Sequence, residues 1–170
     1  MGLLKAIALI GPRESGKSTL AFSFSKFLEK KGFKTGVANL GEGSKALKYE
    51  PFWDVRSKKQ KKTDLFKTAK GEGFDFILLD YTAPLEAFFF TKTQPLDKID
   101  VVLLVFEAGT ASHEDAEELA RVLSERIEKK VIPVENKSEL SKARFSFPSS
   151  VISVSAWEKM GFEKLLSVIS

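Results

Sequence analysis

The sequence predicts an α/β fold in which a mostly parallel sheet of about six strands is covered by helices on both faces. Three observations predict this class. Short apolar runs such as Phe74–Asp80 and Val101–Phe106 are continuous rather than alternating, as expected for strands buried on both faces. Stretches with apolar residues at helical spacing lie between these runs. Finally, 170 residues with 43% hydrophobic side chains suffice for one substantial core, so we expect residues 1–170 to form a single domain.

The first half of the chain begins with a predicted strand and a predicted helix. Leu3–Ile10 is an apolar run typical of a buried strand. Over Lys17–Lys31, apolar side chains recur every three or four residues, which predicts a helix that ends at Gly32. Lys34–Leu40 predicts a second strand. The stretch from Gly41 to Lys62 is polar and lysine-rich and contains glycine, so we interpret it as a long loop.

The second half continues the alternation of strands and helices. Further strands are expected at Phe74–Asp80, Val101–Phe106, Val131–Glu135 and Val151–Val154. Further helices are expected at Thr63–Lys70, after the N-cap Ser112, and at Glu158–Ile169. The helix after Ser112 is expected to bury Ala116, Leu119, Ala120, Leu123 and Ile127, and the last helix Phe162, Leu165, Leu166 and Ile169. In such a sheet, ligands bind at the carboxyl ends of the strands.

Composition excludes several functional classes. The chain has no cysteine and a single histidine, His113, which we expect at the surface; disulfide scaffolds, thiolate chemistry and multi-histidine metal sites are therefore excluded. No apolar run approaches the roughly 18–20 residues that span a bilayer, and the N-terminal residues lack the pattern of a secretory signal. We therefore expect a cytoplasmic protein with no membrane partner. Much of the +4 charge lies in Lys58–Lys62, which could contact nucleic-acid phosphates, although a solvated loop is favoured.

One segment carries a phosphate-binding motif. The sequence GPRESGKS at Gly11–Ser18 matches G-x-x-x-x-G-K-[ST] at every fixed position, between a predicted strand and a predicted helix. Gly11 and Gly16 allow backbone conformations that turn N–H groups toward phosphate oxygens, and the helix N-terminus favours the same anion. We expect Lys17 to reach the β- and γ-phosphates and the Ser18 hydroxyl to ligate Mg²⁺. The motif predicts a nucleoside triphosphate ligand and the three-layer P-loop NTPase fold.

The variable positions of this motif are further candidates for nucleotide contact. Arg13 and Glu14 are bulky residues within the loop. Arg13 would bring a positive charge to the γ-phosphate; in the alternative interpretation, both side chains point to solvent. Ser15 and Thr19 complete the set of residues expected at the phosphate site.

A carboxylate at the end of the third predicted strand is the second fixed point of the site. P-loop proteins use such a carboxylate, here Asp80, to hold Mg²⁺ through water. The alternative is an aspartate that simply ends the strand. Ser18 and Asp80 are therefore the predicted metal-binding pair.

The last two predicted strands are each followed by a motif expected to contact a base. Asn136–Glu139 resembles the N-K-x-D pattern of P-loop GTPases, and Ser155-Ala156 resembles their S-A motif. A carboxylate can accept from guanine N1–H and N2–H, a donor pair that adenine lacks. In this pattern the asparagine braces neighbouring loops, the lysine stem covers the base, and the S-A backbone meets the guanine carbonyl.

Two residues of this region leave alternatives open. Glu139 stands where the pattern has aspartate, and its longer side chain changes the reach of the carboxylate, so discrimination against ATP is expected to be weaker. Trp157 either borders the base or packs in the core. The full set predicted to bind the nucleotide is Gly11, Arg13, Glu14, Ser15, Gly16, Lys17, Ser18, Thr19, Asn136, Lys137, Glu139, Ser155, Ala156 and Trp157.

Within the GTPases, the chain resembles the GPN-loop GTPases over nearly its whole length. Val37–Gly43 and Tyr49–Arg56 resemble their second strand and the Y-x-P-x-x-D-[VI]-R segment after it. Phe76–Phe90 resembles their D-T-P-G-Q-x-E block, with Asp80 and Glu86 at the matching positions. The resemblance implies guanine-nucleotide binding with GTP or GDP, Mg²⁺ as a cofactor, and a homodimer or another protein partner.

The sequence departs from this family at positions that matter for hydrolysis. The Gly-Pro-Asn tripeptide is absent, and the lysine-rich Ser57–Lys70 stretch stands in its region. Gly41 replaces the family's aspartate after the second strand, and Ala83 and Pro84 replace its glycine and glutamine. Those groups help to orient the attacking water and to sense the γ-phosphate, whereas proline offers neither a side-chain amide nor a backbone donor. GTP binding is therefore expected to carry over, and fast hydrolysis is not.

The functional hypothesis is a GTP-binding protein that slowly hydrolyses GTP to GDP and phosphate and acts as a switch or an assembly factor. Lys17 would stabilise the transferred phosphoryl group, Asp80 would hold the metal, and Glu86 would help to order water. Two alternatives stay open. One is a nucleotide-dependent interaction module without catalysis, and the other is an ATP-using P-loop protein such as a small-molecule kinase or a cofactor-assembly factor.

Overall fold

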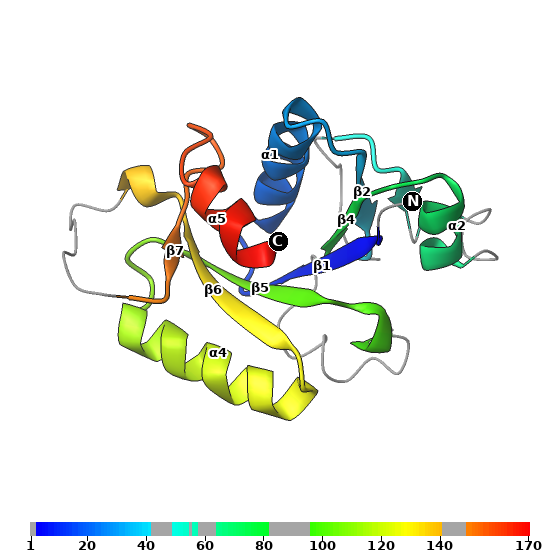
Figure 1. The fold of residues 1–170 in the computed structure, drawn as a ribbon. Coiled ribbons are helices and arrows are strands. Elements are labelled where there is room, and N and C mark those ends of the chain that lie inside the picture. Colours follow the sequence, from blue (N-terminus) through cyan, green and yellow to red (C-terminus); the bar gives the residue numbers. More distant parts are fainter. Residues whose placement is uncertain (1–2, 42–48, 55, 58–63, 82–95, 141–148) are drawn as a thin grey trace.

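A computed structural model of the protein describes residues 3–41, 49–54, 56–57, 64–81, 96–140 and 149–170, which build a seven-stranded parallel sheet (Figure 1). The strands are β1 (Lys5–Ile10), β2 (Thr35–Asn39), β3 (Trp53–Asp54), β4 (Phe76–Asp80), β5 (Val101–Glu107), β6 (Lys130–Asn136) and β7 (Ile152–Ser153). The helices are α1 (Lys17–Lys30), α2 (Leu65–Gly71), α4 (His113–Ile127) and α5 (Phe162–Ile169), with short 3₁₀ turns at Leu96–Lys98 and Ser138–Leu140. Across the sheet the strand order is β3-β2-β4-β1-β5-β6-β7.

Helices cover both faces of the sheet, so the described residues form three layers (Figure 1). Successive residues of a strand point to opposite faces, and β1 shows the consequence. Ile7 and Leu9 pack into a cluster with α1 and α5, whereas Ala8 and Ile10 pack into a second cluster with α2 and α4. This explains why the strand sequences are continuously apolar, and it confirms the predicted three-layer α/β class.

The seventh strand was not expected from the sequence. Trp53 and Asp54 form β3, which pairs with β2 through Ala38 and Asn39, inside the stretch that we interpreted as a loop. The Trp53 side chain is buried against the face that also carries α2. A two-residue strand in a polar stretch has no periodicity to reveal it, because its burial comes from the neighbouring strand.

The last helix begins later than the sequence predicted. It starts at Phe162, whereas the prediction placed its start at Glu158. Ser155 and Met160 instead exchange two backbone hydrogen bonds, of 3.2 and 3.1 Å, which close a tight turn. Residues 157–159 therefore belong to the turn, and Gly161 in the left-handed region leads into α5.

Helix α4 confirms its predicted N-cap but differs in what it buries. The Ser112 hydroxyl accepts a hydrogen bond of 3.0 Å from the Asp115 backbone. Leu119 is exposed, because it lies at the edge of the apolar face. His113, which was expected at the surface, is half-buried: its side chain is 21% exposed and lies 3.4 Å from the Glu135 carboxylate, because the helix packs its first turn against β6.

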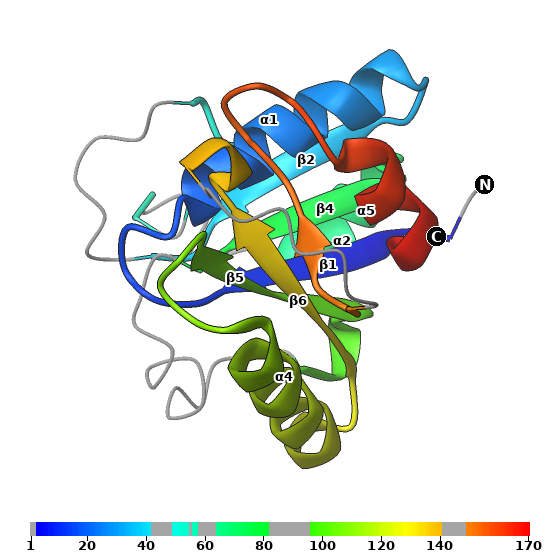
Figure 2. The same cartoon turned by 90° about the vertical axis from the view of Figure 1, so that its left-hand side faces the viewer.

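The parallel strands bring their carboxyl ends to one edge of the sheet (Figure 2). β1 runs into the Gly11–Ser18 loop, β4 ends at Asp80 and β6 ends at Asn136. Segments that are far apart in the sequence therefore meet at this edge, where ligands bind in sheets of this kind. Within the described part of the chain, no helix has the length and apolar character needed to cross a bilayer.

The aromatic contact between α1 and α5 gives a test of this packing. Phe162 is 1% exposed, and its ring lies edge-on to those of Phe24 and Phe27 with centroid separations of 5.4 and 5.5 Å. We expect Phe162→Ala to lower the free energy of unfolding by about 3–5 kcal/mol, because it leaves a cavity between the helices. Leu119→Ala is the control and should change it by less than about 0.5 kcal/mol. Equal effects in urea-unfolding curves would contradict this layer assignment.

Candidate functional site

The Gly11–Ser18 loop leaves β1 in a conformation that requires its two glycines. Gly11 has a φ of 143° and Gly16 a φ of 84°. A Cβ atom on Gly11 would collide with the Val105 carbonyl oxygen, and one on Gly16 with the Asn136 side-chain nitrogen. Glycine at both motif positions therefore lets β5 and Asn136 approach the loop backbone.

The side chain of Lys17 folds back over the loop. Its Nζ donates hydrogen bonds to the Gly11 carbonyl, at 3.0 Å, and to the Pro12 carbonyl. The Ser15 hydroxyl also donates to the Pro12 carbonyl, at 3.0 Å. Burial lowers the pKa of Lys17, and the nearby negative charge of Asp80 acts in the opposite direction. The ammonium group is therefore already held at the loop that the motif predicts to bind phosphate.

A pocket of about 200 Å³ opens at this loop. Its lining comprises Arg13, Glu14, Gly16, Lys17, Ser18 and Thr19, all of which were predicted at the phosphate site. Arg13 and Glu14 are exposed, so both remain accessible to solvent while they border the pocket. Glu14 adopts a φ of 63°, which turns the loop sharply before Gly16.

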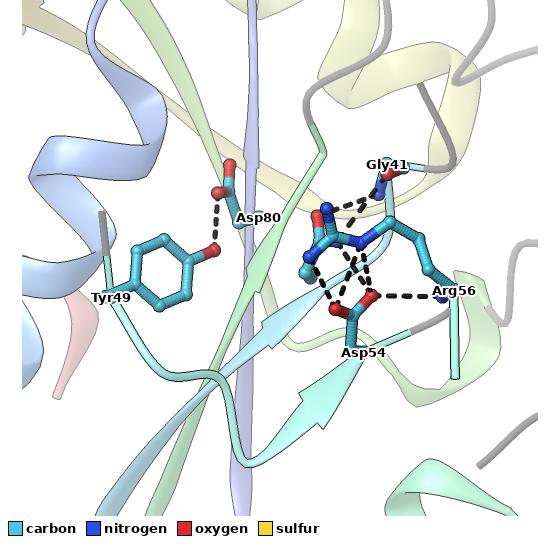
Figure 3. A network of polar contacts seen from close by, with 6 residues as sticks. Gly41, Tyr49, Asp54, Arg56 and Asp80 are labelled. Atoms are coloured by element: carbon cyan, nitrogen blue, oxygen red, sulfur yellow. Dashed lines mark hydrogen bonds and ion pairs between the residues drawn. The ribbon is translucent and has the colours of Figure 1, made fainter. Parts of the chain in front are cut away.

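Asp80 lies fully buried at the end of β4 with only part of its carboxylate bonded. The Tyr49 hydroxyl donates to Oδ2 at 2.7 Å, whereas Oδ1 is buried without a hydrogen-bond partner among the described residues (Figure 3). Burial raises the pKa of Asp80, and the Ser18 hydroxyl, the Tyr49 hydroxyl and the Lys17 charge lower it. Burial likewise raises the pKa of Tyr49, with a further contribution from Asp80. A buried carboxylate oxygen without a donor, close to a second oxygen at Ser18, suits a divalent cation.

A second polar network stands beside Asp80 at the same edge. Asn39 is in register with both Asp80 and Asp54, and its side-chain nitrogen donates to Asp54 Oδ1 at 3.0 Å. Arg56 holds the same carboxylate with Nε and Nη2, at 2.9 and 2.6 Å (Figure 3). These hydrogen bonds from Arg56 lower the pKa of Asp54 to about 2. The Gly41 backbone donates to the Asn39 side chain at 3.1 Å, so the segment that follows β2 is tied to this network.

Asn136 joins the phosphate loop to the turn that follows β7. Its side-chain nitrogen donates to the carbonyls of Ser15 and Gly16, at 3.1 and 3.4 Å, and its side-chain oxygen accepts from the Ala156 backbone at 3.1 Å. The residue is 1% exposed, and Ser15 is 121 positions away in the sequence. The predicted bracing role of this asparagine thus has a direct geometric counterpart.

Lys137 makes a second connection between the same loops. Its Nζ donates to the Glu14 carbonyl at 2.9 Å and pairs with the Glu107 carboxylate at 2.7 Å. Glu107 ends β5 in register with Asn136, which explains its position beside the lysine. The Lys137 stem passes close to Gly16, so it lies along the phosphate loop.

The remaining base-site candidates are divided between buried and exposed positions. Ser155 and Ala156 are buried; the Ser155 hydroxyl accepts from the Glu158 backbone at 3.0 Å. The Ala156 N–H is already bonded to Asn136, so a guanine carbonyl would have to share this donor. Glu139 is exposed in the turn after β6. Trp157 is 82% exposed, which excludes the alternative that it packs in the core.

The structure thus brings the described candidates to one edge of the sheet. The predicted roles of Glu86, Ala83, Pro84 and Lys58–Lys62 lie outside the described residues. Within the described residues, no group of three or more histidine, cysteine, aspartate or glutamate side chains could hold a metal. This is compatible with Mg²⁺, which proteins often bind with one or two side chains plus phosphate oxygens.

Sequence reasoning assigned no role to three residues of this edge: Tyr49, Asn39 and Glu107. Tyr49 begins the quoted Y-x-P-x-x-D segment, which offered a signal for it. Asn39 lies within the quoted Val37–Gly43 segment, but that resemblance gave it no role of its own. Nothing in the sequence marks Glu107, because its partner Lys137 follows the neighbouring strand β6.

Comparisons with known proteins agree on the fold. A scan of protein-family models finds no match to this sequence, and neither does a search of curated proteins. The apo form of the GTPase PAB0955 from Pyrococcus abyssi is similar, with a TM-score of 0.76 and 18% identity, over 97% of this chain and 96% of that one. The hydrogenase maturation factor HypB from Archaeoglobus fulgidus has a TM-score of 0.57 and 15% identity, over 98% and 91%. A nucleotide-binding protein of A. fulgidus in complex with ADP has a TM-score of 0.53 and 13% identity, over 98% and 87%.

At these identities the similarity shows a shared fold. The predicted P-loop NTPase fold is therefore confirmed, and it is the fold of proteins described as GTPases. The same fold also occurs in a protein solved with ADP, so the fold alone does not select the base.

The junction at Asn136 can be tested by removing its side chain. We expect Asn136→Ala to lower the free energy of unfolding by about 1–3 kcal/mol, because buried backbone groups lose their partners. The Ala156 amide should also lose its protection from hydrogen exchange, measured by NMR. Asn39→Ala is the matched control, since it removes a buried asparagine from the other network and should leave the Ala156 amide protected. Unchanged exchange at Ala156 in Asn136→Ala would show that the two loops are joined by other contacts.

Proposed function

We propose that residues 1–170 form a single nucleotide-binding domain that binds GTP or GDP with Mg²⁺ and slowly hydrolyses GTP to GDP and phosphate. The observation that carries the proposal is the double junction made by Asn136 and Lys137. It holds the phosphate loop against the segment that resembles the guanine motif, so one nucleotide could occupy both. If the two motif matches were coincidental, there would be no reason to expect these contacts between the two segments.

The chain's own residues supply the elements of a phosphoryl-transfer site. Hydrolysis requires in-line attack of a water oxygen on the γ-phosphorus, while the bond from that phosphorus to the β–γ bridging oxygen breaks. Lys17, held at the pocket, would neutralise charge that develops on the phosphate oxygens. Glu86 lies outside the described residues and keeps its proposed role in ordering water. Positioning and charge, rather than covalent chemistry, would supply the rate enhancement.

Ser18 and Asp80 are the residues that would hold Mg²⁺. The fit rests on Oδ1 of Asp80, which is buried without a hydrogen-bond partner among the described residues, and on the Ser18 hydroxyl at the start of α1. When bound, Mg²⁺ would neutralise negative charge on the phosphate oxygens. We expect hydrolysis to be slow because Gly41 and Pro84 replace groups that the GPN-loop GTPases use around the attacking water.

The proposal of GPN-loop kinship rests mainly on the sequence motifs. It gains support from the way Tyr49, Asp54 and Arg56 of the Y-x-P-x-x-D-[VI]-R segment gather beside Asp80. We expect residues of this segment to lie together at the site if their resemblance to the family reflects a shared function. A switch or assembly role, a homodimer and a cytoplasmic location remain parts of the same proposal.

Competition binding tests the choice of base. With Mg²⁺ present, we expect the wild-type protein to bind GTP and GDP more tightly than ATP, measured by displacement of a fluorescent guanine nucleotide. Glu139→Ala should weaken GTP binding by about 1–3 kcal/mol, because guanine N1–H and N2–H lose their acceptor. Glu139→Asp is the matched control and should retain the preference for GTP.

The alternative ligand gives a distinct outcome in the same experiment. An ATP-using protein would bind ATP at least as tightly as GTP and would respond little to Glu139→Ala. Titration calorimetry that detects no heat with any purine triphosphate would overturn nucleotide binding altogether.

Phosphate release tests catalysis. We expect multiple-turnover release from GTP that falls by about 100-fold or more in Lys17→Ala, the loss typical of removing a group that stabilises developing charge. Lys26→Ala is the control, because this exposed lysine lies on the same helix and contacts Glu29 and the Phe22 ring and not the phosphate loop. Tight GTP binding with only background release would instead identify a non-catalytic interaction module.

A further inference from the structure

The contact between Tyr49 and Asp80 suggests a role that neither the motifs nor the comparisons assign. The Tyr49 hydroxyl lies 2.7 Å from Oδ2 of Asp80, and the two residues are 8% and 0% exposed. The other carboxylate oxygen, Oδ1, is buried and has no donor in the described structure. The two oxygens of the Asp80 carboxylate therefore differ in their hydrogen bonding within the described structure.

The ring of Tyr49 is held in place by helix α1. Phe22 stacks on it with a centroid separation of 6.1 Å and an interplanar angle of 13°. Phe22 lies one helical turn after Ser18, so both side chains are carried by the same face of the helix. The tyrosine is thus fixed relative to the helix that supplies the proposed metal-binding hydroxyl.

Tyr49 makes the short hydrogen bond to Oδ2, and the Ser18 hydroxyl also interacts with the Asp80 carboxylate. The Lys17 amine is directed at the carbonyls of Gly11 and Pro12. Tyr81, the other tyrosine of the chain, packs in the cluster on the opposite face of the sheet. The terminal torsion of an aspartate is broad, so the Tyr49 hydroxyl, together with the interaction of the Ser18 hydroxyl with the same carboxylate, restricts the rotation of Asp80.

We propose that Tyr49 is a positioning residue for the metal site: its hydroxyl occupies Oδ2 of Asp80, so that Oδ1 is the oxygen presented to the cation or to its bound water. A metal-binding carboxylate that is held in this way is preorganised, because its rotation is already restricted before the cation binds. The inference rests on the proposed function, since it assumes that Asp80 serves a nucleotide-bound cation.

The test measures metal affinity apart from catalysis. Mn²⁺ binding to the protein–GDP complex is followed by electron paramagnetic resonance, which separates free from bound ion. We expect Tyr49→Phe, which keeps the ring and its stacking on Phe22, to weaken Mn²⁺ binding by about tenfold, in the range found for residues that orient metal ligands. GDP affinity measured in EDTA should stay within about twofold of wild type, because the hydroxyl acts only through Asp80.

Tyr81→Phe is the matched control. It also removes a buried tyrosine hydroxyl next to β4, but on the other face, and it should leave Mn²⁺ affinity unchanged. A Tyr49→Phe variant that binds Mn²⁺ as tightly as wild type, or more tightly, would overturn the inference; tighter binding would mark the hydroxyl as a competitor of the cation. A wild-type protein that binds neither GDP nor Mn²⁺ would instead refute the proposed function.

A second variant decides the question if Tyr49→Phe does not fold. Phe22 is 38% exposed, so Phe22→Leu removes the stacking partner at little cost to the core. Loosening the ring should weaken Mn²⁺ binding while GDP affinity in EDTA is retained. Wild-type Mn²⁺ affinity in Phe22→Leu would then overturn the proposal.

Discussion

The candidate site depends on one buried amide, the side chain of Asn136. It donates to two carbonyls of the phosphate loop and accepts from the turn after β7, so three segments share a single rigid group. Such close approach is possible because Gly16 has no Cβ where the Asn136 nitrogen lies. The parallel sheet delivers both partners to the same edge, and the amide fixes their separation. The conformation of the phosphate loop is therefore set partly by a residue 121 positions away from Ser15.

The two ends of this edge differ in how completely their polar groups are bonded. At one end, Asn136 and Lys137 have protein partners for their side-chain donors. At the other end, Oδ1 of Asp80 is buried without a hydrogen-bond donor in the described part of the chain. A buried acceptor without a partner costs free energy, and a bound cation or water would recover it. The side chains at one end are therefore hydrogen-bonded within the protein, whereas a buried acceptor at the other end lacks a donor among the described residues. This difference is expected where a bound ligand supplies the missing interaction.

What the sequence could predict follows from how local each feature is. The phosphate loop, the N-cap at Ser112 and the apolar strands are encoded by neighbouring residues, and the structure places all of them as expected. Other features depend on adjacent strands, so no short sequence pattern predicts them. Examples are the two-residue strand β3 and the pairing of Lys137 with Glu107. Leu119 was wrongly predicted to be buried, because helical periodicity identifies the apolar face of a helix but not how much of that face the sheet covers. The proposed role of Tyr49 could not be predicted from the sequence, because it depends on which oxygen of Asp80 its hydroxyl reaches.

The exposure of Glu139 sets a limit on base selectivity under the proposed function. The Ala156 amide is already engaged by Asn136, so discrimination between guanine and adenine would fall mainly on one carboxylate. A buried carboxylate facing adenine would be left without donors, at a large cost. Glu139 is exposed, so water would hydrogen-bond its carboxylate when adenine is bound. The difference in binding free energy between GTP and ATP would then come only from the two hydrogen bonds to guanine. The preference for GTP should therefore lie near the lower end of the range typical for such contacts, and shortening the side chain to aspartate changes the reach without changing this limit.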